Sequence, residues 1–229
     1  AKDSLRFHCV FCPALLLSAG YEVPRRIFVH GYLTLDDRKI SKSLGNVIDP
    51  LHLVDVYGSD AVRYWATRSV QFGRDGSVSL DSLHERYERE LGNDLGNLVS
   101  RTTAMIAKYR DGRIPIAPGA EGAPSLDALG QEVEKRLDEF DLTGAIDAIW
   151  DAVRALNKFV TDSKPWELAK DEANAEELDR VLYALADGIR VVAVALHAYL
   201  PETTPRILQA LGQPDDFDWS FVAPGQIVE

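Results

Sequence analysis

Hydrophobic residues recur every three to four positions through most of the chain beyond residue 80, a period typical of helices with one buried face. The first series is Leu91, Leu95, Leu98, Thr102 and Met105. It predicts a long helix from residue 81 that ends at Asp111 and Gly112, before a Pro- and Gly-rich linker at 115–124. Further helices are expected at 125–140, 143–162, 165–169, 176–199 and 204–211. Short connections between them favour an all-α bundle of about five helices.

The first 35 residues follow a different pattern. An apolar helical stretch ends at Gly20, and a short apolar run at 27–30 predicts a strand. One helix and one strand cannot form a sheet domain by themselves. We therefore interpret residues 1–35 as a fragment of an α/β unit.

Residues 36–80 combine loops with two short helices. One is predicted at 50–57, and a second at 61–70 with Ser59 and Asp60 as its cap. The inward positions expected for this second helix are Val62, Trp65 and Ala66. The remaining tryptophans outside any recognisable motif, Trp150 and Trp219, are also expected to pack in the interior.

Composition is that of an ordinary soluble globular protein, with 46% hydrophobic and 27% charged residues among 229. The sequence contains no apolar run of about 18 residues, and no basic segment followed by an apolar core opens it. We therefore expect a cytoplasmic protein without a membrane partner.

Charge is distributed unevenly along the chain. Residues 1–113 contain 16 Lys and Arg against 14 Asp and Glu, whereas residues 114–229 contain 9 against 22, which gives the net charge of -11. Phosphate binding requires a local cationic patch rather than a basic protein as a whole. An RNA-binding surface is therefore expected mainly in the first half, and DNA is not an expected partner.

Cys9 and Cys12 are the only cysteines and form a C-x-x-C pair within the apolar helical stretch. A structural zinc site needs four ligands, and only His8 lies nearby. Packing in a reducing compartment is the favoured interpretation. A metal or redox site is the alternative, and we expect no metal bound by this segment.

The most informative short motif is Lys39-Ile40-Ser41-Lys42-Ser43, which Gly45 and Asn46 follow. Two lysines on a short hydroxyl-rich loop can neutralise the triphosphate of a nucleotide and the charge that develops on leaving pyrophosphate. The simpler interpretation of the motif alone is a solvated basic turn. Its flanking residues decide between these interpretations.

The stretch from His30-Gly31-Tyr32-Leu33 through this loop resembles the second signature of the class I aminoacyl-tRNA synthetases. The segments 2–8 and 13–16 narrow the resemblance to the methionyl-tRNA synthetase family. The resemblance covers essentially the whole chain and implies a mainly α fold in three parts. These are a C-terminal remnant of a Rossmann-type α/β catalytic domain at 1–35, the KMSKS-type loop with a stem-contact fold at 36–80, and an α-helical anticodon-binding bundle at 81–229.

The resemblance also implies roles for individual residues. Lys39 and Lys42 would act on the ATP phosphates, with Ser41 and Ser43 assisting. Asp3 would hold the ribose, and the positions expected to border the adenine are His30, Gly31 and Leu33. His8 and Cys12 match methionine-pocket positions, although Cys12 replaces the usual Trp and Ile40 the usual Met. An ordinary exposed histidine is the alternative for His8.

Asn97 and Arg101 are spaced i, i+4 and share one face of the long helix, about 100° from its apolar stripe. Amide and guanidinium groups suit the Watson–Crick edges of unstacked bases, and Trp166, after Pro165, offers a ring on which a base can stack. These three residues match the family's readers of the CAU anticodon. A surface polar pair and a core tryptophan are the alternatives.

The resemblance predicts the C-terminal part of a methionine–tRNA ligase whose substrates are methionine, ATP with Mg²⁺, and tRNA. Because the HIGH-type ATP signature is absent from these residues, we expect no ATP–pyrophosphate exchange by this chain alone. The alternative is a stand-alone, non-catalytic tRNA-binding module. A synthetase for Ile, Val, Leu or Cys is a third possibility, against which the Asn97, Arg101 and Trp166 set argues.

Overall fold

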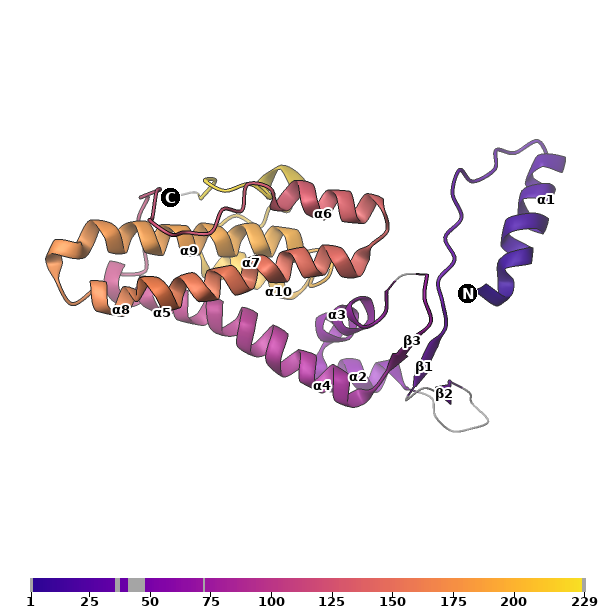
Figure 1. Ribbon diagram of the computed structural model, residues 1–229, viewed down its shortest axis with the longest axis horizontal. Helices are drawn as coiled ribbons and strands as arrows, with labels where there is room; N and C mark the ends of the chain where they lie inside the picture. Colours follow the sequence, from indigo (N-terminus) through magenta and orange to yellow (C-terminus); the bar gives the residue numbers. More distant parts are fainter. Residues whose placement is uncertain (1, 36–37, 41–47, 72, 228–229) are drawn as a thin grey trace.

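The fold, known from a computed structural model, is described for residues 2–35, 38–40, 48–71 and 73–227, with the side chains at 38 and 39 excepted. It is mainly helical, as predicted, and also contains one small sheet. Helices α5, α6, α7, α9 and α10 form a bundle, and α1 lies at the far end of an extended segment (Figure 1). No described helix is long and apolar enough to cross a membrane.

A continuous helix runs the length of one side of the molecule, as the periodicity predicts. It consists of α4 (Leu80–Arg86), a π-helical stretch η4 (Tyr87–Gly96) and α5 (Asn97–Arg110). Ser79 begins it with a reciprocal capping box to Ser82, and Asp111 ends it in the left-handed region at φ 52°. The predicted buried face is confirmed at Leu95, Leu98, Thr102 and Met105, and Leu91 is half-buried.

The π-helical stretch was not predicted. Its hydrogen bonds reach back five residues rather than four, so that the Asn97 N–H bonds the carbonyl of Gly92. A Cβ at Gly96 would lie 3.1 Å from the Leu91 carbonyl oxygen, which makes this glycine the close-approach position of the widened turn. Such widening depends on packing around the helix and leaves no distinct period in the sequence.

The bundle is built around α9, whose residues from Val181 to Leu196 are almost all buried. After α5, the bundle helices are α6 (Leu129–Asp138), α7 (Leu142–Ser163), α9 (Ala175–Leu196) and α10 (Thr203–Ala210). The short helix α8 (Pro165–Leu168) and the 3-10 turns η5 (Glu172–Asn174) and η6 (Trp219–Phe221) lie between or after them. Helix α6 packs on α7, and α5, α7, α8 and α10 pack on α9. Complete burial of each Leu, Ile or Val contributes about 1.5–3 kcal/mol.

The tryptophans do not all follow expectation. Trp65 and Trp150 are buried, at 6% and 0% exposure, and the Trp150 ring lies 4.8 Å from that of Tyr64. Trp219 is 37% exposed, so the prediction that it packs in the interior is wrong. It lies in η6, a single turn begun by the Asp218 side chain, which leaves its ring at the surface.

Helices α2 (Pro50–Tyr57) and α3 (Ser59–Ser69) match the two short helices predicted before residue 70. The predicted cap of α3 is wrong: neither Ser59 nor Asp60 caps it, and the Asp60 carboxylate instead accepts from backbone N–H groups of α10. Ala66 is exposed, and Val62 only half-buried. The side chains that α3 buries are Asp60, Ala61, Tyr64 and Trp65.

A three-stranded sheet lies beside α3 and α4 in the order β2-β1-β3. Strand β1 (Leu33–Leu35) pairs antiparallel with β2 (Arg38–Lys39) and parallel with β3 (Gly76–Val78). The strand predicted at 27–30 is wrong: this run is not in a strand, because pairing begins only where β3 lies alongside. Strand β3 was not predicted, because it follows a turn and spans three residues.

The N-terminal helical segment comprises η1 (Lys2–Ser4), a π-helical stretch η2 (Phe7–Phe11) and α1 (Cys12–Ser18). The chain turns at Gly20, where φ is 77°, as expected for the end of this helix. The segment exposes large apolar side chains, of which Phe7, Phe11, Leu15 and Leu17 are each more than half exposed.

Candidate nucleic-acid interface

Asn97 and Arg101 lie one turn apart on α5, both with exposed side chains. Leu98, Thr102 and Met105, on the adjacent face of the helix, are buried in the bundle. The helix therefore presents the amide and the guanidinium to solvent from a rigid support.

Trp166 lies beside this pair, although it comes from a different helix. The Arg101 guanidinium carbon is 5.8 Å from the centroid of the Trp166 ring, a distance at which a cation is attracted to an aromatic face. The indole is 36% exposed, so it is neither a core ring nor a fully solvated one. The structure thus brings together all three residues for which the sequence suggested anticodon contact, and the alternative of a core tryptophan is wrong.

The backbone around Trp166 fixes the start of its helix. Lys164 adopts the left-handed conformation, with φ 44°, and turns the chain sharply between α7 and α8. Pro165 follows at the first helical position, where its fixed φ is favourable, and it is buried. Pro165 is thus packed in the bundle, while the next residue, Trp166, remains partly exposed.

Two further contacts hold the same end of α5. Asn157 of α7 donates to the Asp94 carbonyl at 2.9 Å, which ties the π-helical stretch to α7 just before Asn97. The Asn97 side-chain amide also donates to Oδ1 of Asn93 at 3.4 Å. Neither contact was predicted from the sequence.

The Lys39–Ser43 motif lies only partly among the described residues. The Lys39 backbone lies in β2, opposite Thr34 of β1, so the loop starts at the edge of the sheet. Ser41, Lys42 and Ser43 lie outside the described residues. Strand β3 passes through Ser79 directly into α4, which connects this sheet to the helix that carries Arg101.

The residues matched to ATP binding lie around β1. Leu33 is 48% exposed, and the His30 Nδ1 lies 2.9 Å from the Gly31 carbonyl oxygen. Gly31 is buried, and a Cβ there would lie 2.0 Å from the Arg74 carbonyl oxygen, so the glycine allows the chain before β3 to approach. Asp3 is exposed and lies close to Tyr32, the residue between Gly31 and Leu33.

A small polar cluster near Asp3 was not predicted. The Asp75 carboxylate accepts from the Tyr32 N–H at 2.8 Å and from the Lys2 ammonium at 2.5 Å. The Lys2 hydrogen bond, then the Tyr32 N–H, lower the pKa of Asp75. Loss of solvent, followed by the neighbouring Asp3 carboxylate, raises the pKa of Tyr32. The cluster joins the N-terminal helical segment to β1.

His8 and Cys12 lie one turn apart on the N-terminal helical segment, His8 exposed and Cys12 half-buried. The His8 ring meets Phe7 edge-on, with centroids 5.4 Å apart. Cys9 and Cys12 are both free thiols. Among the described residues, no three His, Cys, Asp or Glu side chains gather in a way that could hold a metal ion.

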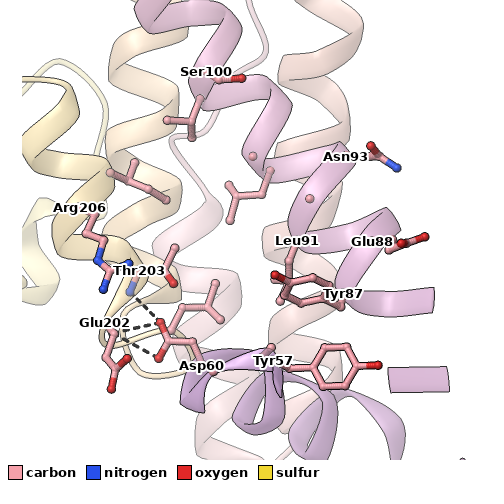
Figure 2. A pocket seen from close by; sticks show the side chains of 18 of the residues that line it. Tyr57, Asp60, Tyr87, Glu88, Leu91, Asn93, Ser100, Glu202, Thr203 and Arg206 are labelled. Atoms are coloured by element: carbon pink, nitrogen blue, oxygen red, sulfur yellow. Dashed lines mark hydrogen bonds between the residues drawn. The ribbon is translucent and has the colours of Figure 1, made fainter. Parts of the chain in front are cut away.

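A groove of about 990 Å³ opens between the middle of the long helix, the α2–α3 junction and α10 (Figure 2). Asp60, Glu202 and Thr203 meet at one end of it, and Arg206 lies beside them. Its charged lining residues are Asp60, Glu88, Glu202 and Arg206. With three carboxylates and one guanidinium, the groove does not suit a phosphate group, which leaves the Asn97, Arg101 and Trp166 surface as the better nucleic-acid candidate.

Comparison with known proteins gives one consistent answer. The family model described as tRNA synthetases class I (M) matches residues 1–103. The methionine–tRNA ligase of Caldanaerobacter subterraneus subsp. tengcongensis is 39% identical over 235 residues, which cover 100% of this chain and 37% of that protein. The methionine–tRNA ligase of Mycobacterium tuberculosis is 40% identical over 232 residues, covering 98% of this chain and 44% of that protein.

The chain is a member of the methionyl-tRNA synthetase family. Methionyl-tRNA synthetase from Mycobacterium tuberculosis in complex with methionyl-adenylate superimposes with a TM-score of 0.91 at 39% identity, covering 98% of this chain and 47% of that one. The free form of the same enzyme gives 0.87 at 36% identity. The 229-residue chain spans less than half the length of these methionyl-tRNA synthetases.

Proposed function

We propose that this chain is the C-terminal part of a methionine–tRNA ligase, and that it supplies the KISKS phosphate-binding loop and the reader of the CAU anticodon. The parent activates methionine with ATP and Mg²⁺ and esterifies the tRNA. The single observation that carries the anticodon assignment is the Arg101 guanidinium over the Trp166 ring, beside Asn97 on the same helix.

The chemistry of this surface supports the proposal. A partly exposed indole ring can stack an unpaired base, which contributes roughly 1–3 kcal/mol, and a planar guanidinium beside it can bond a base edge or stack in turn. Asn97 offers both a donor and an acceptor to a base edge. Helix α5 itself carries no acidic side chain that would repel an RNA backbone, although Asp94 and Glu167 flank the surface.

In the proposed ligase, Lys39 and Lys42 act as point charges on the ATP triphosphate, with Ser41 and Ser43 donating hydrogen bonds. Asp3, with His30, Gly31 and Leu33, borders the nucleoside, and His8 with Cys12 borders the methionine. Support for the nucleoside assignment comes from the contact of Asp3 with Tyr32 at the start of β1. The Mycobacterium tuberculosis relative is in complex with methionyl-adenylate, the compound that forms when ATP activates methionine.

An affinity comparison tests the anticodon assignment. The 229-residue chain is titrated with a labelled anticodon stem-loop carrying CAU, and with one that differs only in those three bases. We expect preference for CAU of at least tenfold, on the order of one or two base-edge contacts. Equal affinity for the two stem-loops would remove the assignment.

A second assay separates the chain from its proposed parent. ATP–pyrophosphate exchange by the 229 residues alone is expected to be absent, since the HIGH-type ATP motif is not among them. Measurable exchange would contradict this. The alternative of a stand-alone, non-catalytic module is not favoured, because the relatives compared are described as ligases.

A further inference from the structure

Helix α3 carries two oppositely charged side chains, Asp60 and Arg63, that reach the turn between α9 and α10. The Asp60 carboxylate is 7% exposed and accepts from the Glu202 N–H at 3.0 Å and from the Thr203 N–H at 2.6 Å. The Arg63 guanidinium donates to the Ala198 carbonyl at 2.9 Å. Figure 2 shows Asp60 with its partners at the end of the groove.

These contacts match the polarity of the two helices that they touch. Amides at a helix start need an acceptor, and carbonyls just past a helix end need a donor. Helix α10 receives no cap from its own Glu202 side chain, so the acceptor comes from Asp60, on a different part of the chain. Helix α3 has no side-chain cap of its own at Gly58. Asp60 therefore caps the start of α10 rather than the start of α3, the helix in which it lies.

Helix α3 also contacts α7, at positions one and two turns beyond Asp60. The Tyr64 ring lies 4.8 Å from that of Trp150, and Arg68 pairs with Asp147 at 2.5 Å. The Asp60 and Arg63 contacts, which we call the α3 clasp, fall instead on the α9–α10 turn. Helix α3 is therefore attached to the bundle at two separate places.

Helix α3 lies between the two regions to which we have assigned RNA and ATP contacts. On one side it adjoins β3 and α4, where Trp65 donates to the Ser82 hydroxyl at 3.0 Å. On the other side lies the bundle with Arg101 and Trp166. The α3 clasp is therefore one of the contacts that join the region of the sheet to the bundle that carries the anticodon surface.

We infer that Asp60 and Arg63 are positioning residues for tRNA, which hold the stem-contact region at a fixed orientation to the anticodon surface. This inference rests on the function proposed above. A tRNA that contacts both regions gains affinity from their rigid connection, because the second contact forms at high effective concentration. An isolated anticodon stem-loop touches only one region and gains nothing.

The test compares full-length tRNA with its anticodon stem-loop, both carrying CAU, on Asp60→Ala, Asp60→Asn and Arg63→Ala variants of the 229-residue chain. Wild type is expected to bind the full-length tRNA more tightly. Asp60→Ala should weaken full-length binding about tenfold and leave stem-loop binding unchanged. Asp60→Asn, which retains one acceptor oxygen, should fall between, and Arg63→Ala should shift in the same direction. Arg89→Ala, an exposed arginine paired with Glu85 on the long helix, is the matched control and should change neither affinity.

Equal losses for both RNAs, or none for either, would overturn the inference, as would a wild type that binds the two equally. If Asp60→Ala does not fold, exposed Arg63 decides the outcome. Failure of the proposed function is distinguishable, because wild type would then bind the CAU stem-loop and a stem-loop with three other bases at those positions equally.

Discussion

The Arg101 guanidinium lies over the Trp166 ring, with 5.8 Å between its central carbon and the ring centroid, although the two residues belong to different helices. One consequence is that the free protein already covers this aromatic face with a cation. A base that stacks on the indole must share the ring with the guanidinium or displace it. The pair is therefore a preformed platform rather than two separate contact residues.

Replacement of Trp166 by Ala should weaken CAU stem-loop binding by roughly 1–3 kcal/mol, since the stacking surface is lost. Fluorescence anisotropy of a labelled stem-loop measures the change. Trp219→Ala is the matched control, because that ring is exposed to nearly the same extent, 37% against 36%, but lies in η6. Comparable losses in the two variants would contradict a specific role for Trp166.

Arg101→Lys should separate charge from geometry. Lysine keeps the positive charge but loses the planar fork that can stack on a ring and bond a base edge with two donors. Preference for CAU over an altered loop should therefore fall, while the dependence of log Kd on log salt concentration stays unchanged. Arg101→Ala should lose both, and Arg154→Ala, at an exposed site on α7 paired with Asp151, should lose neither. A fully retained preference in Arg101→Lys would rule out recognition by the fork.

Thr102→Val should stabilise the protein by about 1 kcal/mol. The Thr102 side chain is completely buried, and its hydroxyl has no hydrogen-bond partner among the described residues. A methyl group of the same shape removes that unpaired oxygen. Urea unfolding measures the effect, with Thr103→Val as control, since the Thr103 hydroxyl donates to the Val99 carbonyl at 3.0 Å. Destabilisation of the Thr102 variant would show that the hydroxyl is satisfied in solution.

Tyr199 should make stability sensitive to alkaline pH. Burial, and then the Asp141 charge, raise the pKa of Tyr199 to about 12. Below its ordinary value of about 10 the phenol is protonated in both states, so its contribution is fully present. Between about 10 and 12 only the unfolded chain ionises, so stability falls as pH rises.

Urea midpoints on either side of pH 10 measure this effect. Tyr199→Phe should reduce the alkaline loss, although it also removes the hydrogen bond to the Leu142 carbonyl at 3.3 Å and so lowers stability at neutral pH. Tyr21→Phe, at a position 68% exposed, should leave the alkaline loss unchanged. An unaltered pH dependence in Tyr199→Phe would mean that other groups cause it.

The helices could be predicted from sequence because each buries one face against a common core, which imposes the observed period. The long helix and the exposure of Asn97 and Arg101 follow from that stripe alone. The end of α7 and the start of α8 at Pro165 could also be predicted, because proline is favoured at the first position of a helix.

Other features depend on tertiary contacts that no local pattern encodes. The run at 27–30 has strand-like composition but no partner, whereas the shorter β1 pairs with a segment far away in sequence. Asp60 has the sequence signature of a helix cap and does cap a helix, but α10 rather than its own. The direct contact between Arg101 and Trp166 is not encoded in the local pattern of either helix, and only the family resemblance grouped these two residues.

The most direct test of anticodon reading is the fluorescence of Trp166 itself. The 229-residue chain is titrated with the CAU stem-loop, and a Trp166→Phe variant gives the signal of the remaining tryptophans. The fluorescence of wild type minus that of Trp166→Phe is the contribution of Trp166. If a base stacks on this ring, the CAU stem-loop should quench that contribution, and a loop with three other bases should leave it unchanged at the same concentration. Identical quenching in wild type and Trp166→Phe would contradict the assignment of this surface to the anticodon.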